Sequence, residues 1–440
     1  MNGLSALKAS YHTLGCKLNF AETSAVSRSL REAGVVRIGP GEKPDICVVN
    51  TCSVTETADK KGRQLIRRLA SRYPEATIVV TGCYAQLKPA EVAELPHVAI
   101  VLGSNDKLRA AEFVEQWIAE RRQRVCVADS RSYRTFMPSC ERGDRTRYFL
   151  KVQDGCDYWC TYCTIPMARG RSRSGRIEDL AALARRTVAE GGREIVITGV
   201  NTGDFGKGTD SNFFDLIRAL DAVEGIDRYR ISSIEPNLLT DDMIRWIARE
   251  SRAFMPHFHI PLQAGSDAVL KLMRRRYATD LFRERIELIR SEMPDAFVGV
   301  DVIAGARGET GEEFERGVEF IASLPVQQLH VFPYSERPGT RALELDACTV
   351  PQDEKHRRVE RLMALSAAKY TAFLESQTGK ERPVLWEQPH AGAAVMHGFT
   401  DNYLRVEAPY DERLVNSITP TRLAERIAED TLRGEILAVR

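Results

Sequence analysis

The chain has 440 residues, of which 43% are hydrophobic, and its formal net charge is +1. This length allows two or three domains with separate cores, while no apolar run approaches the roughly 18 residues that a membrane helix needs. Because the start, MNGLSALKASYHTLGC, lacks the apolar stretch of a signal peptide, we expect a cytoplasmic protein with no membrane partner. In that compartment ten cysteines favour metal binding or catalysis over disulfides.

Residues 1–129 alternate short apolar runs with amphipathic stretches, which is typical of strands alternating with helices. Such alternation predicts a parallel sheet covered by helices on both faces, with ligands at the carboxyl ends of the strands. Cys16, Cys52 and Cys83 each follow an apolar run. We therefore expect three thiols from distant parts of the sequence to meet at one edge of this sheet.

The rest of the chain predicts a linker and two more domains, which makes the protein α/β overall. Residues 130–146 are polar and arginine-rich, as in a linker, and residues 147–378 contain six strand–helix units, which predict a partial (βα)6 barrel. A long helix follows from about residue 353. Residues 379–440 are β-rich and predict a small all-β barrel.

The segment KVQDGCDYWCTYCTIP places three thiols, Cys156, Cys160 and Cys163, in a loop directly after the first strand of the predicted barrel. Three thiolates suit a four-iron cluster whose fourth iron stays open for another ligand. A structural zinc loop is the alternative, but it needs a fourth ligand, and the nearest other cysteines, Cys140 and Cys348, lie in different segments. Neither of them belongs to a ligand motif, and we expect both to be free loop thiols. Cys47 is expected in the core, and Cys126, also without a ligand motif, in a short strand.

The CxxxCxxC motif resembles that of radical S-adenosylmethionine enzymes, and GGREIVITG and VDVIAG are similar to their cofactor-binding segments. The whole chain is similar to the methylthiotransferase family, which has an N-terminal domain with three cysteine ligands, a radical barrel and a C-terminal TRAM domain. The resemblance implies S-adenosylmethionine and two [4Fe-4S] clusters. It assigns one cluster to Cys16, Cys52 and Cys83 and the other to Cys156, Cys160 and Cys163. It assigns cofactor contacts to Tyr162, Glu194, Gly199, Ser232, Gln263 and Ile303.

The segment around the first cysteine, GCKLNFAET, resembles the corresponding segment of family members that act on N6-threonylcarbamoyladenosine at position 37 of tRNA. This resemblance implies that a methylthio group is added to C2 of the adenine, with one S-adenosylmethionine as methyl donor and another as source of the 5′-deoxyadenosyl radical. The alternatives are isopentenyladenosine in tRNA, a ribosomal-protein aspartate, another radical reaction that does not use the N-terminal cysteines, or a non-catalytic metal-containing RNA-binding protein. Ala264 and Ala306–Arg307 depart from the family pattern.

The expected partners are the anticodon loop of tRNA and an electron donor such as flavodoxin or ferredoxin. The run IPMARGRSRSGR follows the cysteine loop, so we expect Arg169 and Arg171 to contact phosphates. In the C-terminal barrel, an RNA contact is expected either from a face that includes Arg405 and Arg413 or from stacking of Tyr403 on a base, and the alternative is a purely structural cap. The sequence does not fix the oligomeric state and is compatible with a monomer.

Overall fold

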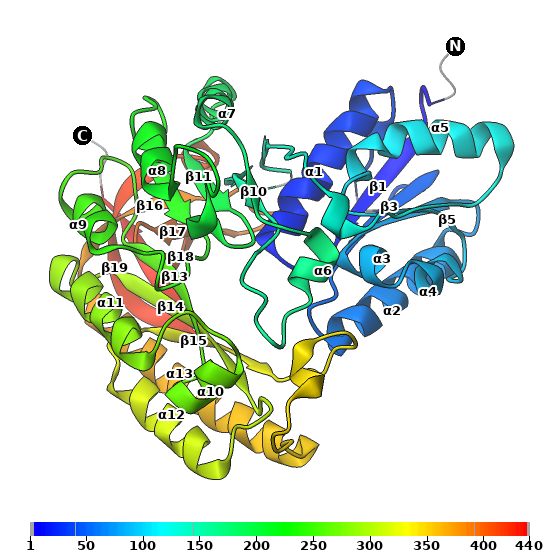
Figure 1. Cartoon of the computed structure of the whole chain (residues 1–440). Helices are drawn as coiled ribbons and strands as arrows, with labels where there is room; N and C mark the ends of the chain where they lie inside the picture. The colour runs from blue at the N-terminus through cyan, green and yellow to red at the C-terminus, as the bar shows by residue number, and fades with distance from the viewer. Residues whose placement is uncertain (1–3, 40, 144, 391, 438–440) are drawn as a thin grey trace.

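The computed structural model describes residues 4–39, 41–143, 145–390 and 392–437. Its first unit is a six-stranded parallel sheet in the order β2-β1-β3-β4-β5-β6, with helices on both faces (Figure 1). Alternate residues of the strands pack in two separate cores, one against α2 and the other against α1 and α5. The strands are β1 (Lys8–Thr13), β2 (Val36–Arg37), β3 (Ile46–Thr51), β4 (Thr77–Gly82), β5 (Val98–Leu102) and β6 (Arg124–Cys126). The helices are α1 (Lys17–Glu32), α2 (Glu56–Arg72), α3 (Cys83–Leu87), α4 (Pro89–Ala93) and α5 (Ala110–Glu120).

The central unit is an open barrel of six strands in two adjoining sheets, as the strand pattern predicts. One sheet has the order β12-β11-β8-β7 and the other β13-β14-β15, and only an isolated bridge at Tyr229–Phe254 lies between them. The parallel strands are β8 (Tyr148–Lys151), β11 (Glu194–Thr198), β12 (Arg228–Ile231), β13 (His257–Gln263), β14 (Phe297–Ala304) and β15 (Gln328–Pro333). The helices are α6 (Ile165–Arg169), α7 (Ile177–Ala189), α8 (Phe213–Asp221), α9 (Asp241–Arg249), α10 (Asp267–Leu272), α11 (Thr279–Glu292) and α12 (Gly311–Ser323). Two short strands, β9 (Gln153–Asp154) and β10 (Arg173–Ser174), pair antiparallel at the two ends of the segment that contains α6.

The segment expected to be a polar linker adds a strand to the barrel. Residues of β7 (Ser139–Glu141) pair antiparallel with β8, and Cys140 is 1% exposed, with its thiol 3.2 Å from Thr187 Oγ1. The expectation that Cys140 is a surface thiol is therefore wrong, because this strand pairing buries it. Cys47 is buried in the first unit, Cys126 ends β6 and Cys348 is exposed.

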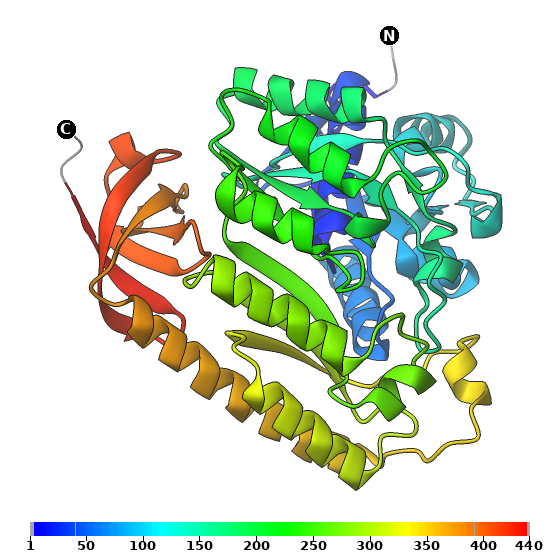
Figure 2. The ribbon, with the colours of Figure 1, turned by 60° about the vertical axis from the view of Figure 1, so that its left-hand side comes forward.

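A long helix, α13 (Gln352–Gln377), leads to a closed five-stranded barrel in the order β16-β17-β18-β20-β19 (Figure 2). Arg228 and Arg230 of β12 fasten this barrel to the central unit by donating hydrogen bonds to its backbone carbonyls. The strands are β16 (Glu381–Trp386), β17 (Val395–Thr400), β18 (Arg405–Pro409), β19 (Ile418–Ala428) and β20 (Thr431–Ile436). Among the described residues, no helix is both long and apolar enough to cross a bilayer.

Candidate active site

Three cysteines of the N-terminal unit lie at the same edge of its sheet. Cys16 lies shortly after β1, Cys52 directly after β3 and Cys83 directly after β4, and these three strands are parallel neighbours. Asn19, one turn into α1, donates hydrogen bonds to the carbonyls of Leu14 (2.8 Å) and Thr51 (3.1 Å). One amide side chain therefore ties the loop of Cys16 to that of Cys52.

Two glycines allow these loops to approach one another. Gly15 and Gly82 precede Cys16 and Cys83, and both have positive φ angles, +102° and +97°. A Cβ atom at Gly15 would lie 2.7 Å from Cys52 Cβ, and one at Gly82 would lie 2.3 Å from the Thr51 carbonyl oxygen. Both the backbone conformation and the close contact exclude a side chain at these positions.

The chemistry of this donor set fits a metal cluster. Burial, together with smaller effects of the neighbouring thiols of Cys83 and Cys16, raises the pKa of the Cys52 thiol to about 12. Thiols that oppose one another's ionisation release their protons when a metal binds. In the part of the chain that the structure describes, no three His, Cys, Asp or Glu side chains converge on a single metal ion. Three thiolates suit an iron–sulfur cluster, in which each would bind a different iron.

The second set of thiols lies in the loop between β9 and α6. Burial raises the pKa of Cys156 to about 12 and also raises that of Cys160, although Arg275 opposes the shift at Cys160. The guanidinium Nη1 of Arg275 lies 3.2 Å from Cys160 Sγ, as expected for a cation that favours the thiolate. Thr161 holds the loop in place by donating to the carbonyl of Leu272 (2.9 Å).

One thiol of each set lines a cavity, and the two cavities adjoin. The larger cavity, of about 480 Å³, is lined by Cys16 and Lys17, by the strands of the central unit and by Tyr403 of the C-terminal barrel. The smaller cavity, of about 280 Å³, lies beside Cys163. The two share Asp301 and Phe332 as walls. A molecule in the larger cavity would lie against Cys16, with the smaller cavity and Cys163 beyond the shared walls.

Comparisons with known proteins agree with this arrangement. Residues 8–103 match the model of the uncharacterized protein family UPF0004, and residues 150–321 match that of the radical SAM superfamily. The chain is 40% identical to the threonylcarbamoyladenosine tRNA methylthiotransferase MtaB of Bacillus subtilis, over 94% of this chain and 93% of that protein. It is 36% identical to MtaB of Thermotoga maritima, over 90% of both chains. The chain belongs to the radical S-adenosylmethionine methylthiotransferase family. Membership implies S-adenosylmethionine and [4Fe-4S] clusters as cofactors.

Other members and solved structures are more distant. The tRNA-2-methylthio-N(6)-dimethylallyladenosine synthase of Thermobifida fusca is 33% identical over 80% of this chain and 72% of that protein. Among solved structures, the radical S-adenosylmethionine methyltransferase TsrM of Kitasatospora setae superposes with a TM-score of 0.57 at 13% identity, covering 77% of this chain and 74% of that one. At this identity the likeness shows the fold alone.

The cofactor contacts that the sequence predicts for this methylthiotransferase lie mostly around the two cavities. Tyr162, Gln263 and Ile303 line the smaller cavity, while Gly199 and Ser232 line the larger one. Gln263 has a positive φ angle of +69°, at a register shift between β13 and β14. Such backbone strain often occurs where a side chain is directed at a ligand.

Glu194 does not lie at the site, so the expectation of a cofactor contact is wrong. It begins β11, whereas the other end of that strand reaches the larger cavity, about 13 Å away at the rise of a β-strand. Its carboxylate is buried and accepts a hydrogen bond from Arg230 Nε at 2.8 Å. The residue therefore stabilises the junction with the C-terminal barrel.

Arg169 is also not the phosphate contact that the arginine-rich run predicts. Its side chain is buried and donates to Glu22 Oε1 and Asp154 Oδ1, both at 3.0 Å, and to Asn19 Oδ1 at 2.7 Å. Burial alone would raise the pKa of Glu22, but Arg169, Lys107 and Lys151 outweigh it and hold that pKa well below its usual range. Arg171, in contrast, is exposed.

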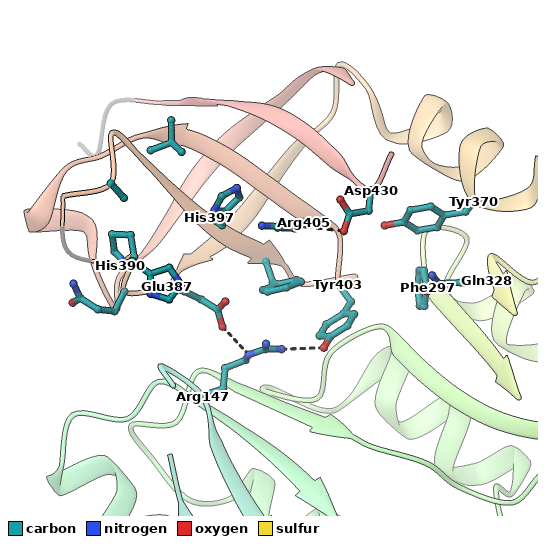
Figure 3. Close-up of a pocket in the computed structure, with 15 residues that line it drawn as sticks. Arg147, Phe297, Gln328, Tyr370, Glu387, His390, His397, Tyr403, Arg405 and Asp430 are labelled. Atoms are coloured by element: carbon teal, nitrogen blue, oxygen red, sulfur yellow. Dashed lines mark hydrogen bonds and ion pairs between the residues drawn. The ribbon is translucent and has the colours of Figure 1, made fainter. Parts of the chain in front are cut away.

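Tyr403 lies in a wall between two cavities and is not an exposed stacking platform. Its ring packs against Phe399 (5.0 Å between centroids) and His257 (4.4 Å), and its hydroxyl accepts a hydrogen bond from Arg147 (3.1 Å). Figure 3 shows Tyr403 and Arg147 in a third cavity, of about 570 Å³, beneath the C-terminal barrel. Arg405 lines this outer cavity and pairs with Asp430, while Arg413 is exposed and pairs with Asp411.

Sequence reasoning missed the contacts that join the N-terminal unit to the barrel. Arg169 joins α6 to Glu22 of α1 in this way. A second tie is Arg337, which donates to Ser53 Oγ (2.8 Å), next to Cys52, and to Asp59 Oδ2 (2.7 Å). The only pattern in the sequence that points to the first tie is the spacing of Asn19 and Glu22 on one helix face after Cys16.

Proposed function

We propose that the protein adds a methylthio group to C2 of N6-threonylcarbamoyladenosine at position 37 of tRNA. Five relatives named as methylthiotransferases for this nucleoside are 32–40% identical to the chain over 90% or more of its length. The observation that carries the proposal is that Cys16 of one set of thiols and Cys163 of the other, which come from different units, line cavities that share two wall residues. A reaction that uses both sets on one base requires such proximity.

We propose Cys16, Cys52 and Cys83 as ligands of one cluster and Cys156, Cys160 and Cys163 as ligands of the other. When bound, these clusters and S-adenosylmethionine supply the sulfur, the methyl group and the radical that abstracts hydrogen. The protein itself supplies position. Tyr162, Gln263 and Ile303 are suited to holding S-adenosylmethionine beside Cys163, and Gly199 and Ser232 leave room for the base in the larger cavity.

The tRNA contact is supported by the names of the relatives and by the exposed Arg171 near the site. A nucleotide of the anticodon loop can leave its stack at modest cost and enter the larger cavity, with the outer cavity leading to it past Tyr403. A tRNA substrate agrees with a cytoplasmic location, and we propose flavodoxin or ferredoxin as the electron donor. We retain 1–129, 130–146, 147–378 and 379–440 as the proposed division of the chain.

The test is nucleoside analysis of tRNA by mass spectrometry from a strain in which the gene is deleted. We expect 2-methylthio-N6-threonylcarbamoyladenosine to disappear and its unmethylthiolated precursor to accumulate. The wild-type gene should restore the modification, whereas Cys52→Ala should not. Unchanged levels of this nucleoside, or loss of the 2-methylthio-isopentenyladenosine instead, would contradict the proposal.

A further inference from the structure

A lysine in the wall of the larger cavity has no anionic partner. Lys17 follows Cys16, begins α1 and lines the cavity as a half-buried residue. Across the described ranges, its ammonium group makes no hydrogen bond and no ion pair within 4.0 Å. Tyr403 and Asp301 lie within electrostatic range of it, but neither makes a direct contact.

The other charged groups around Lys17 are already paired. Arg147 donates to Glu387 (3.1 Å) and to the Tyr403 hydroxyl, and Arg230 donates to Glu194. Asp301 Oδ1 accepts a hydrogen bond from His259 Nε2 at 2.8 Å. Among these charged groups of the described residues, Lys17 is therefore the one without a hydrogen-bonded partner of opposite charge. A partly desolvated ammonium group without an anion is unfavourable, so the cavity is suited to a ligand that brings a carboxylate.

We infer that Lys17 binds the threonyl carboxylate of the substrate and thereby selects N6-threonylcarbamoyladenosine, an inference that rests on the proposed function. The reacting C2 atom and the N6 substituent lie on the same edge of the adenine ring, with only N1 and C6 between C2 and N6. If Cys16 holds the cluster that delivers the methylthio group to C2, the adjacent Lys17 would be within reach of the group on N6. An isopentenyl group carries no charge and gains nothing from this contact.

The experiment compares two anticodon stem-loop RNAs, one carrying N6-threonylcarbamoyladenosine and the other its threonyl methyl ester. The reconstituted full-length protein is assayed under anaerobic conditions with S-adenosylmethionine and reductant. We expect the wild type to favour the acid over the ester by about 10- to 100-fold in kcat/KM, as is typical of a hydrogen bond to a charged group. Lys17→Met should lower kcat/KM for the acid by the same factor and abolish the preference, while Lys17→Arg should retain part of it.

The matched control is Lys61→Met, which removes an exposed lysine on α2 and should keep the wild-type preference. Iron and sulfide content verifies that Lys17→Met holds its clusters. A Lys17→Met protein that still favours the acid overturns the inference. Equal kcat/KM of the wild-type protein for acid and ester also overturns it, and this comparison does not depend on the folding of any variant. Failure of the wild type to convert the acid RNA, with conversion of an isopentenyladenosine RNA, instead overturns the proposed function.

Discussion

Replacing Arg169 by methionine removes four hydrogen bonds, three of which join the helix after the second cysteine loop to α1, the helix after Cys16. The guanidinium group donates twice to Glu22 and once each to Asp154 and Asn19. Asn19 also holds the loops of Cys16 and Cys52, and Arg169 ends the helix that follows Cys163. Methionine keeps the apolar stem of the side chain but makes none of these bonds. We therefore expect the variant to fold while losing the fixed distance between the two sets of thiols.

The loss in free energy of unfolding depends on which partners Glu22 and Asp154 keep after the substitution. Removing one member of a buried charge pair costs about 3–5 kcal/mol when its partner is left alone. Glu22 keeps Lys107 at 2.7 Å and Lys151 at 2.9 Å, and Asp154 keeps Lys151 at 2.8 Å. We expect the lower value, about 3 kcal/mol. A shift of about 1 Å between the sets should reduce product formation about 100-fold.

The assay measures 5′-deoxyadenosine and the methylthiolated nucleoside in the same reaction. In the proposed function, cleavage of S-adenosylmethionine needs only the second cysteine set, so the ratio of 5′-deoxyadenosine to product should rise about 100-fold in Arg169→Met. Arg176→Met, which removes an exposed arginine paired only with Glu178, serves as the control and should keep the wild-type ratio. If Arg169→Met keeps the wild-type ratio of 5′-deoxyadenosine to product, including the case in which both fall equally, the positioning role is refuted.

Three further predictions concern the tRNA contact and the N-terminal thiols. Arg171→Ser should weaken tRNA binding and reduce the slope of log affinity against log salt by about 1; an unchanged slope in a filter-binding titration would exclude a phosphate contact. Cys52→Ala should lose about four of about eight irons and all methylthiolation but still cleave S-adenosylmethionine, and full iron content would contradict its assignment as a ligand. Gly82→Ala places a Cβ atom 2.3 Å from the Thr51 carbonyl and should lower the iron content like Cys52→Ala; wild-type iron by chemical analysis would show that the loops can rearrange.

Local patterns in the sequence predict most of the fold. The strand candidates of the central unit match β8 and β11–β15, because each strand is a compact apolar run bounded by polar turns. The convergence of Cys16, Cys52 and Cys83 also follows from local features, since each thiol follows a strand of one parallel sheet. That β1, β3 and β4 are direct neighbours is a property of the whole sheet and had to come from the structure.

Contacts between distant segments explain the errors. Arg169 lies in an arginine-rich segment whose composition predicts a solvent-exposed surface. Its partner Glu22 is 147 residues away in the sequence. Cys140 is buried by a strand pairing that no local pattern predicts, and Tyr403 is enclosed only because the C-terminal barrel packs on the central unit. For Glu194, the motif identifies the correct strand but not which of its ends faces the cavity.

The most direct test of two thiol sets acting on one base is anaerobic turnover with a tRNA stem-loop that carries deuterium at C2 of N6-threonylcarbamoyladenosine. We predict that each methylthiolated product is accompanied by transfer of deuterium from C2 into 5′-deoxyadenosine, and that Cys16→Ala abolishes the product. Product formed without deuterium transfer, or formed equally well by Cys16→Ala, would contradict the account.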